Sequence, residues 1–280
     1  MPSATSAPSS LSTDDGLHLF TRSWPSSSPR AVVALVHGYA EHSGRYDHVA
    51  RTFTEQGATV HAYDQRGHGH SDGRRAYVAS FERYLDDLDR FLDHVRAQTP
   101  DVPLFLFGHS MGGLVVLKYV LDRNPSPRGL LLSAPAIQIN PDLAPLVRRI
   151  AQFIGRWFPT LPTTRSPQGA ISRDPDVVAE AQNDPLNYHG RVLARTGAEM
   201  LRAGRDVQTN LSALDDPFLV IHGTADRLAT PSWSQRLYEQ AASDDKTIHL
   251  YEGLYHETFN EPEQDEVLHD LGTWLDAHVS

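Results

Sequence analysis

One serine of the chain lies where a buried strand turns directly into a helix. The segment Leu104–Val116 reads LFLFGHSMGGLVV, so Ser110 has a glycine two residues away on each side. Gly108 and Gly112 allow strand and helix to approach closely, and the residue at so short a corner is forced into a strained conformation that exposes its hydroxyl. An ordinary glycine-rich turn between a strand and a helix can have the same sequence pattern. The interpretation as a nucleophile therefore depends on finding a base, an acid and an oxyanion hole.

A serine hydroxyl is a weak nucleophile and needs a histidine to take its proton and a carboxylate to orient that histidine. Ligands of open parallel sheets bind at the carboxyl ends of the strands, which restricts the choice among the 15 histidines. Asp226 follows the predicted strand PFLVIHG and His256 follows the predicted strand KTIHLYEG, whereas Asp215 and Asp216 lie before a strand. The order serine, aspartate, histidine is that of the α/β-hydrolase fold. We therefore predict a triad of Ser110, Asp226 and His256.

An oxyanion hole requires two backbone N–H groups near the nucleophile. The N–H of Met111 follows Ser110 directly, and that of Tyr39 lies in the loop after the predicted strand of ALVHGYAEHSGRY. A dehalogenase or an epoxide hydrolase would need aspartate in place of Ser110, so the chemistry predicted is that of a serine hydrolase.

Composition excludes several other classes. The formal net charge of −10, with no basic cluster, argues against binding to nucleic acid. The chain has no cysteine, so it has neither disulfides nor thiolate metal sites. The segment RGHGHSDG holds His68 and His70 without a third ligand at a recognisable spacing, which favours a structural turn over a metal site. No phosphate-binding or dinucleotide motif occurs, so we predict no metal and no cofactor.

Short β-branched runs alternate with helical patterns along most of the 280 residues. This predicts an α/β fold with a mostly parallel sheet and helices on both faces. We expect the first part of the core at residues 1–139, with a mobile tail at 1–12, a helical cap insertion at 140–210, and the second part of the core at 211–280. The segment LHLFTRSW is expected to be an antiparallel edge strand. The helices predicted in the core span residues 46–56, 81–97, 111–122, 232–241 and 261–277.

Five segments together resemble the monoacylglycerol lipase family of serine hydrolases, in particular its bacterial and mycobacterial members. They are HGYAEHSGRYDHVA, YDQRGHGHSDG, GHSMGG, IHGTADRLATP and YEGLYHETFNE. The resemblance runs from about residue 17 to the C-terminus and implies an α/β-hydrolase fold with a helical cap. It also implies that Glu41 and Arg45 lie near the glycerol head of the substrate. The family often has alanine, leucine or glycine where this chain has Tyr39, so we expect a narrower pocket there.

The predicted activity is hydrolysis of monoacylglycerols to fatty acid and glycerol through an acyl-enzyme on Ser110. A general esterase, a lysophospholipase or an acyltransferase using the same triad remains an alternative. A protein with this fold that binds a small ligand without turnover is an alternative of another class.

The cap segment DLAPLVRRIAQFIGRWF carries apolar residues at helical spacing, among them Ile150, Ile154 and Trp157. One interpretation is a helix packed on the core; the other is a helix that contacts the acyl chain or a membrane surface. For Asn183 and Tyr188, in NDPLNYHG, we expect turn and packing roles. The start of the chain lacks the pattern of a secretory signal, and no apolar run is long enough to span a membrane. We expect a cytoplasmic protein or one peripherally associated with the membrane or cell envelope, and the sequence leaves its oligomeric state open.

Overall fold

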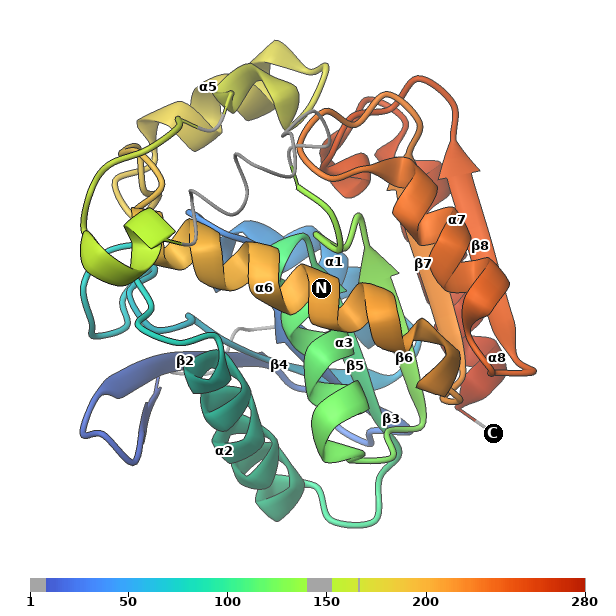
Figure 1. Cartoon of the computed structure of the whole chain (residues 1–280). Coiled ribbons are helices and arrows are strands. Elements are labelled where there is room, and N and C mark those ends of the chain that lie inside the picture. The colour runs from blue at the N-terminus through green and yellow to red at the C-terminus, as the bar shows by residue number, and fades with distance from the viewer. Residues whose placement is uncertain (1–8, 140–152, 166, 280) are drawn as a thin grey trace.

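An eight-stranded sheet in the order β1-β2-β4-β3-β5-β6-β7-β8 forms the centre of the molecule (Figure 1). The computed structural model describes residues 9–139, 153–165 and 167–279. Strands β3 to β8 are mutually parallel. Strand β1 pairs antiparallel with β2, and β2 pairs antiparallel with β4. The predicted α/β fold with a mostly parallel sheet is confirmed. The strands are β1 (Ser9–Ser12), β2 (His18–Trp24), β3 (Ala31–Val36), β4 (Ala58–Tyr63), β5 (Leu104–His109), β6 (Gly129–Ser133), β7 (Phe218–Gly223) and β8 (Lys246–Tyr251).

Helices cover both faces of the sheet because its central strands are apolar on both sides. Strand β3, with the sequence AVVALV, is buried over its whole length. Successive side chains of a strand point to opposite faces. Alternate residues of β3 therefore pack with helices α2 (Glu82–Gln98) and α3 (Met111–Arg123) on one face and with α1 (Asp47–Glu55) and α8 (Gln264–His278) on the other.

The helices predicted in the core are present, and their ends differ from the prediction by at most three residues. The predicted helix at residues 232–241 is α7 (Pro231–Gln240). The other helices of the described residues are α5 (Pro175–Asn183), α6 (Ala194–Asn210) and a helical turn at residues 153–157, with short 3₁₀ turns at Ser43–Tyr46, Gln168–Ala170, Leu211–Ala213 and Thr258–Asn260. Within the described ranges, no helix combines the length and apolar character needed to cross a membrane.

The expected mobile tail at residues 1–12 is wrong for its last four residues. Ser9–Ser12 form strand β1, which pairs antiparallel with β2. As a result β2 is not at the edge of the sheet, as predicted, but lies between β1 and β4. The serine-rich sequence of β1 has no apolar pattern, because this strand is largely exposed and is held by backbone hydrogen bonds. Residues 1–8 lie outside the described part of the chain.

Residues 153–165 and 167–213, which lie between β6 and β7 and are called here the cap segment, are mainly helical. Helix α6 lies across α3 (Figure 1). The cap segment is also tied to the loop after β3, because the N–H of Tyr188 donates to the carbonyl of Ala40 at 2.9 Å. The division of the chain into core and cap at residues 140 and 210 remains a prediction.

The order of the strands places a crevice beside Ser110. From β3 the chain continues to β4 on one side and then returns to β5 on the other side of β3. Such a switch point leaves a crevice at the carboxyl ends of the two strands. The loop after β3 begins at His37, and the turn after β5 is Ser110 itself. The predicted oxyanion loop and the predicted nucleophile are therefore neighbours.

Replacing Gly112 with alanine should destabilise the fold, because the new methyl group would overlap the carbonyl oxygens of Val36 and His37 at the end of β3. Overpacking typically costs about 1–3 kcal/mol, so we expect the free energy of unfolding in urea to fall by at least about 2 kcal/mol. Gly169→Ala is the control, since a methyl group there meets nothing within 4 Å, and it should change stability by less than about 0.5 kcal/mol. Equal stability of the two variants would contradict this close packing.

Candidate active site

The backbone of Ser110 has the strained conformation that the sequence predicted. Its φ is 53° and its ψ is −117°, a backbone conformation that residues other than glycine rarely adopt. A methyl group on Gly108 would lie 2.7 Å from the carbonyl oxygen of Gly112. The close approach of β5 and α3 thus requires glycine at position 108, and the close approach of α3 to the end of β3 requires it at position 112.

Hydrogen bonds on both sides of Ser110 hold this conformation in place. Its N–H donates to the carbonyl of Ser133 at the end of β6, at 2.9 Å. Its own carbonyl accepts from the N–H groups of Ala136, at 2.9 Å, and Leu114, at 3.1 Å. Strain of this kind persists where the surrounding structure over-determines the backbone. The turn therefore presents the Ser110 hydroxyl in a defined place above the sheet.

The structure brings together the three side chains of the predicted triad. His256 Nε2 lies 2.8 Å from Ser110 Oγ, and His256 Nδ1 lies 2.6 Å from Asp226 Oδ2. An ionised carboxylate only accepts hydrogen bonds, so Nδ1 carries the proton and Nε2 is free to accept the proton of Ser110. This is the arrangement that activates a serine for attack on a carbonyl carbon.

Asp226 is held by four hydrogen-bond donors, two on each oxygen. Oδ1 accepts from the N–H of Leu228 at 2.7 Å and of Ala229 at 3.1 Å. Oδ2 accepts from His256 and also from His222 Nε2, which lies 2.9 Å away. Burial alone would raise the pKa of Asp226, but the charge of His256 and the hydrogen bonds of both histidines hold that pKa well below its usual range. Asp226 is therefore ionised at and around neutral pH.

The charge of Asp226 in turn acts on His256. Burial would lower the pKa of His256, but the negative charge of Asp226 and its hydrogen bond outweigh burial and raise the pKa above its ordinary value of 6.5. Glu257 and Glu41 add to this effect. The imidazolium that forms when His256 takes the serine proton is thus stabilised.

The backbone segments predicted to supply the oxyanion hole both border Ser110. Met111 begins α3 directly after Ser110. Tyr39 follows Gly38, where an added methyl group would lie 3.3 Å from Ser110 Cβ. Across the described ranges, the N–H groups of Tyr39 and Met111 have no hydrogen-bond partner within the protein. Both donors are available to a developing oxyanion.

Glu41 and Arg45 border the cavity, but their polar groups already bind one another and Glu257. Arg45 Nη1 donates to Glu41 Oε2 at 2.9 Å, and both terminal nitrogens of Arg45 donate to Glu257 at 2.8 Å. Glu41 Oε1 accepts from the N–H of Gly38 at 2.6 Å and from the hydroxyl of Tyr46 at 2.7 Å. Burial disfavours the charge of Glu257, but Arg45 lowers its pKa to about 2. The ion pairs join the loop that carries Tyr39 to the loop that carries His256.

His109, beside the nucleophile, lines the cavity and packs against His256 and Ser133. Its ring lies 4.8 Å from the ring of His256, and its Nδ1 is 3.1 Å from the hydroxyl of Ser133. Burial and the neighbouring His256 lower the pKa of His109 to about 4. It is therefore an uncharged neighbour of the base.

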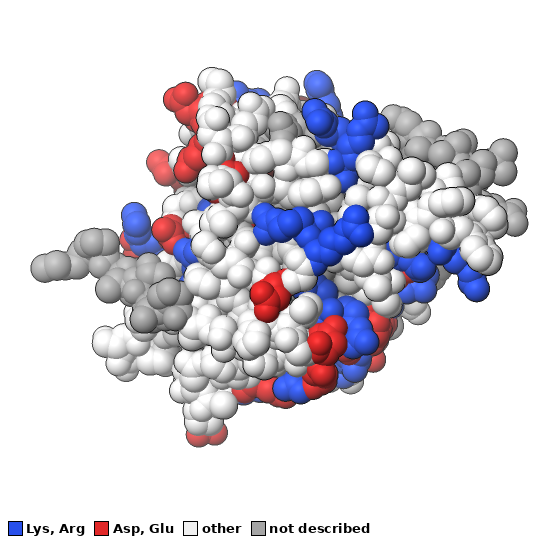
Figure 2. All heavy atoms as spheres, turned by 90° about the vertical axis from the view of Figure 1, so that its left-hand side faces the viewer, with Lys and Arg blue, Asp and Glu red and all other residues white. Residues whose placement is uncertain are grey.

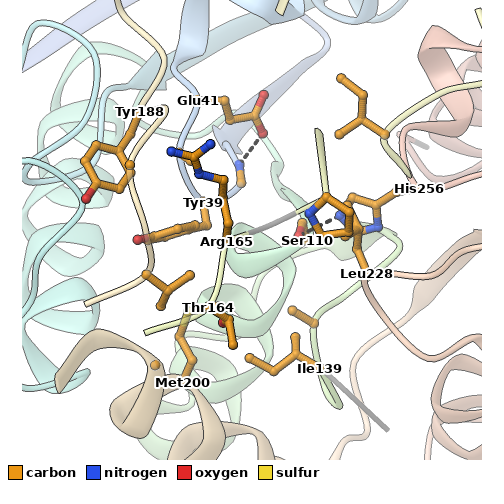
Figure 3. A pocket seen from close by; sticks show the side chains of 18 of the residues that line it. Tyr39, Glu41, Ser110, Ile139, Thr164, Arg165, Tyr188, Met200, Leu228 and His256 are labelled. Carbon is orange, nitrogen blue, oxygen red and sulfur yellow. Dashed lines mark hydrogen bonds between the residues drawn. The ribbon is translucent and has the colours of Figure 1, made fainter. Parts of the chain in front are cut away.

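A cavity of about 440 Å³ opens over Ser110 and His256 and has a polar and an apolar part (Figure 3). In the view of Figure 3, Glu41 and Arg165 lie above Ser110, while Ile139 and Met200 lie below it. The lining also includes Tyr39, Ile154, Tyr188, Leu201 and Leu228.

The apolar stripe predicted for the cap segment divides between two surfaces. Ile154 lines the cavity, whereas Trp157 is 63% exposed and does not line it. Trp157 as a substrate contact is thus not supported by the structure, because its side chain lies on the outer side of the helical turn at residues 153–157. Ile150 lies outside the described residues. Tyr188, expected to serve in a turn and in packing, borders the cavity with its ring 6.5 Å from that of Tyr39.

Two buried side chains of the site were not identified from the sequence: His222, which binds Asp226, and Glu257, which binds Arg45. His222 lies four residues before Asp226 at the end of β7, and Glu257 directly follows His256. His222 could have been noticed as a polar residue at the end of an apolar strand, and Glu257 as a charge beside the predicted base. Within the part of the chain that the structure describes, no group of three or more histidine and carboxylate side chains is arranged to hold a metal ion.

Comparison with known proteins identifies the relatives of this chain. Residues 27–263 match the family described as serine aminopeptidase, S33. The monoacylglycerol lipase of Mycolicibacterium smegmatis is 36% identical over 280 residues, which cover all of both chains. The monoglyceride lipase of Rattus norvegicus is 35% identical over 95% of this chain and 89% of its own. The crystal structure of Paleococcus ferrophilus monoacylglycerol lipase has a TM-score of 0.84 at 32% identity, covering 93% of this chain and 99% of its own.

The raised pKa of His256 predicts the pH dependence of the reaction. His256 must be neutral to accept the serine proton, so activity is absent below its pKa and present above it. We expect kcat/KM for p-nitrophenyl butyrate to rise with pH through an apparent pKa above 6.5 and then level off. Asp226→Asn removes the charge that raises this pKa, so the acidic limb should move to lower pH. The variant also no longer fixes the tautomer of His256, so kcat should fall by about 10⁴-fold. A wild-type limb at or below pH 6.5 would contradict the assignment.

Proposed function

The chain belongs to the serine aminopeptidase S33 family and, within it, to the monoacylglycerol lipases, and we propose that it hydrolyses monoacylglycerols to glycerol and a fatty acid. The observation that carries the proposal is the position of Ser110 between the polar and the apolar part of one cavity. A monoacylglycerol has one polar head and one apolar chain, joined at the ester that reacts. The cavity volume of about 440 Å³ is within the usual range for a small-molecule site.

Each step of the proposed reaction uses a group of this chain. Ser110 Oγ attacks the ester carbonyl while His256 Nε2 takes its proton, and the N–H groups of Tyr39 and Met111 bind the oxyanion. His256 then gives the proton to the glycerol oxygen, which leaves, and an acyl-enzyme remains on Ser110. His256 next takes a proton from water, whose oxygen attacks the acyl carbonyl. Collapse of this second intermediate releases the fatty acid and returns the proton to Ser110.

We propose that the head group lies against the Glu41 side of the cavity and the acyl chain against Ile139, Ile154 and Met200. Oε1 of Glu41 already accepts from two donors, whereas Oε2 accepts only from Arg45 among the described residues and has a second lone pair for a glycerol hydroxyl. Arg45 is committed to two carboxylates, so we propose that it acts on the head group through Glu41.

The cap segment also presents an apolar surface for which we propose contact with a lipid membrane. Phe153, Trp157 and Phe158 are each more than 60% exposed, and Leu161 is 46% exposed. Exposed aromatic residues of this kind on a short helical segment are typical of interfacial contact. Figure 2 shows the face of the molecule on the left in Figure 1, where basic side chains gather centrally and most acidic ones lie along the margins. Such a face suits an anionic bilayer despite the net charge of −10. We therefore propose peripheral membrane association.

A panel of glycerol esters with the same acyl chain tests the proposed activity. We expect kcat/KM for the monoacylglycerol to exceed that for the triacylglycerol at least tenfold, because one cavity holds one chain. Ser110→Ala should lose turnover of every ester and also labelling by a fluorophosphonate. Faster hydrolysis of a lysophospholipid would favour a lysophospholipase instead, and equal rates on mono- and triacylglycerols would contradict the proposal.

Variants of the cap segment separate acyl binding from membrane contact. In wild type, kcat/KM should rise with acyl length by at most about fourfold per methylene, from about 0.8 kcal/mol for each buried CH₂. Ile154→Ser should flatten this rise while leaving p-nitrophenyl acetate hydrolysis nearly unchanged. Trp157→Ser is the matched control on the same helical turn: it should keep the rise but weaken co-sedimentation with anionic vesicles. Loss of acetate hydrolysis in Ile154→Ser would indicate a packing role.

A further inference from the structure

A second histidine shares the oxygen of Asp226 that faces the base. His222 Nε2 lies 2.9 Å from Asp226 Oδ2, and His256 Nδ1 lies 2.6 Å from the same oxygen. His222 and Asp226 have fully buried side chains, and that of His256 is 5% exposed. Because the carboxylate accepts from both rings, each histidine presents an N–H to it.

The other ring nitrogen of His222 also has a hydrogen-bond partner. Its Nδ1 lies 2.7 Å from the hydroxyl of Ser234, a residue of α7 that is 1% exposed. In the tautomer that carries its proton on Nε2, Nδ1 accepts from the Ser234 O–H. The carboxylate of Asp226, which only accepts, thus selects this tautomer, and the Ser234 hydroxyl supplies the matching donor to Nδ1. A continuous chain of hydrogen bonds runs from Ser234 through His222, Asp226 and His256 to Ser110.

The four donors on Asp226 fill the acceptor sites of its two oxygens. Leu228 and Ala229 bind Oδ1 through their backbones, and the two histidines bind Oδ2. A carboxylate held on all sides cannot rotate away from His256. The donor from His222 also draws on the negative charge of Oδ2 and leaves less of it facing His256.

We propose that His222 is a positioning residue of the hydrolytic reaction, which fixes the orientation of Asp226 and sets how much of its charge acts on His256. The proposal rests on the triad of the proposed function, but it does not depend on which ester is the substrate. Neither the spacing within the elbow nor the order of the triad requires this histidine. Its role follows from the shared oxygen and from the complete burial of the pair.

Three variants test the proposal on the soluble ester p-nitrophenyl butyrate. His222→Leu removes the donor, so more charge of Asp226 faces His256, its imidazolium is stabilised, and the acidic limb of kcat/KM should move to higher pH. The freed carboxylate also loses its orientation, so kcat should fall about tenfold or more, with KM changed less than twofold. His222→Gln retains an N–H donor at the end of a side chain of similar reach and should restore the wild-type limb and most of kcat. Ser234→Ala removes only the donor on Nδ1 of His222, which weakens the hydrogen bond from its Nε2 to Asp226, and should shift the limb in the same direction by a smaller amount.

The outcomes separate a positioning role from a packing role. A wild-type limb and kcat in His222→Leu would overturn the proposal, and so would equal loss of kcat in the leucine and glutamine variants with the limb unmoved. If His222→Leu does not fold, Ser234→Ala decides: a shifted limb supports the proposal and an unmoved limb overturns it.

Ser110→Ala, assayed in parallel, keeps this test distinct from that of the proposed function. Activity remaining in Ser110→Ala would overturn the triad and with it the role of His222. If the wild type hydrolyses p-nitrophenyl butyrate but no monoacylglycerol, only the substrate assignment fails, and the His222 comparison is unaffected.

Discussion

The site depends on holding Ser110 at a positive φ between a strand and a helix. Such a conformation costs about 1–3 kcal/mol. It is offset by hydrogen bonds to Ser133 and Ala136 and by the burial of β5 and α3 on both sides. Because Ser133 ends β6, the place of the hydroxyl depends on the register of the neighbouring strand. The nucleophile is thus positioned by the sheet as a whole rather than by a flexible loop.

Around this fixed serine, two groups of buried charges keep the surrounding loops in place. Asp226 binds both histidines and two backbone N–H groups, and Arg45 joins Glu41 to Glu257. A buried charge without a partner destabilises a protein strongly, and each carboxylate of these two groups is paired. The same pairs connect the loops after β3 and β8. The oxyanion donor on one loop and the base on the other are therefore held relative to each other.

The cap segment shows how one apolar stripe serves two surfaces. On the helical turn at residues 153–157, Ile154 borders the cavity while Phe153 and Trp157 face outward, with their rings 6.3 Å apart. A helix shows different faces to the core and to solvent, and both can be apolar when the outer face contacts something other than water. Periodicity in the sequence identifies the stripe but cannot assign its two sides, since that depends on where the helix rests on the core.

The sequence by itself determined the alternation of strands and helices and the turn at Ser110, because these depend on local pattern and on glycine spacing. It also predicted which aspartate and histidine reach Ser110, since parallel strands bring their carboxyl ends to one edge. Only the tertiary structure decided the pairing of β1, the outward orientation of Trp157 and the sharing of Asp226 by His222 and His256. A polar strand held by backbone hydrogen bonds leaves no apolar pattern, and a buried pair forms between side chains whose directions are set by packing.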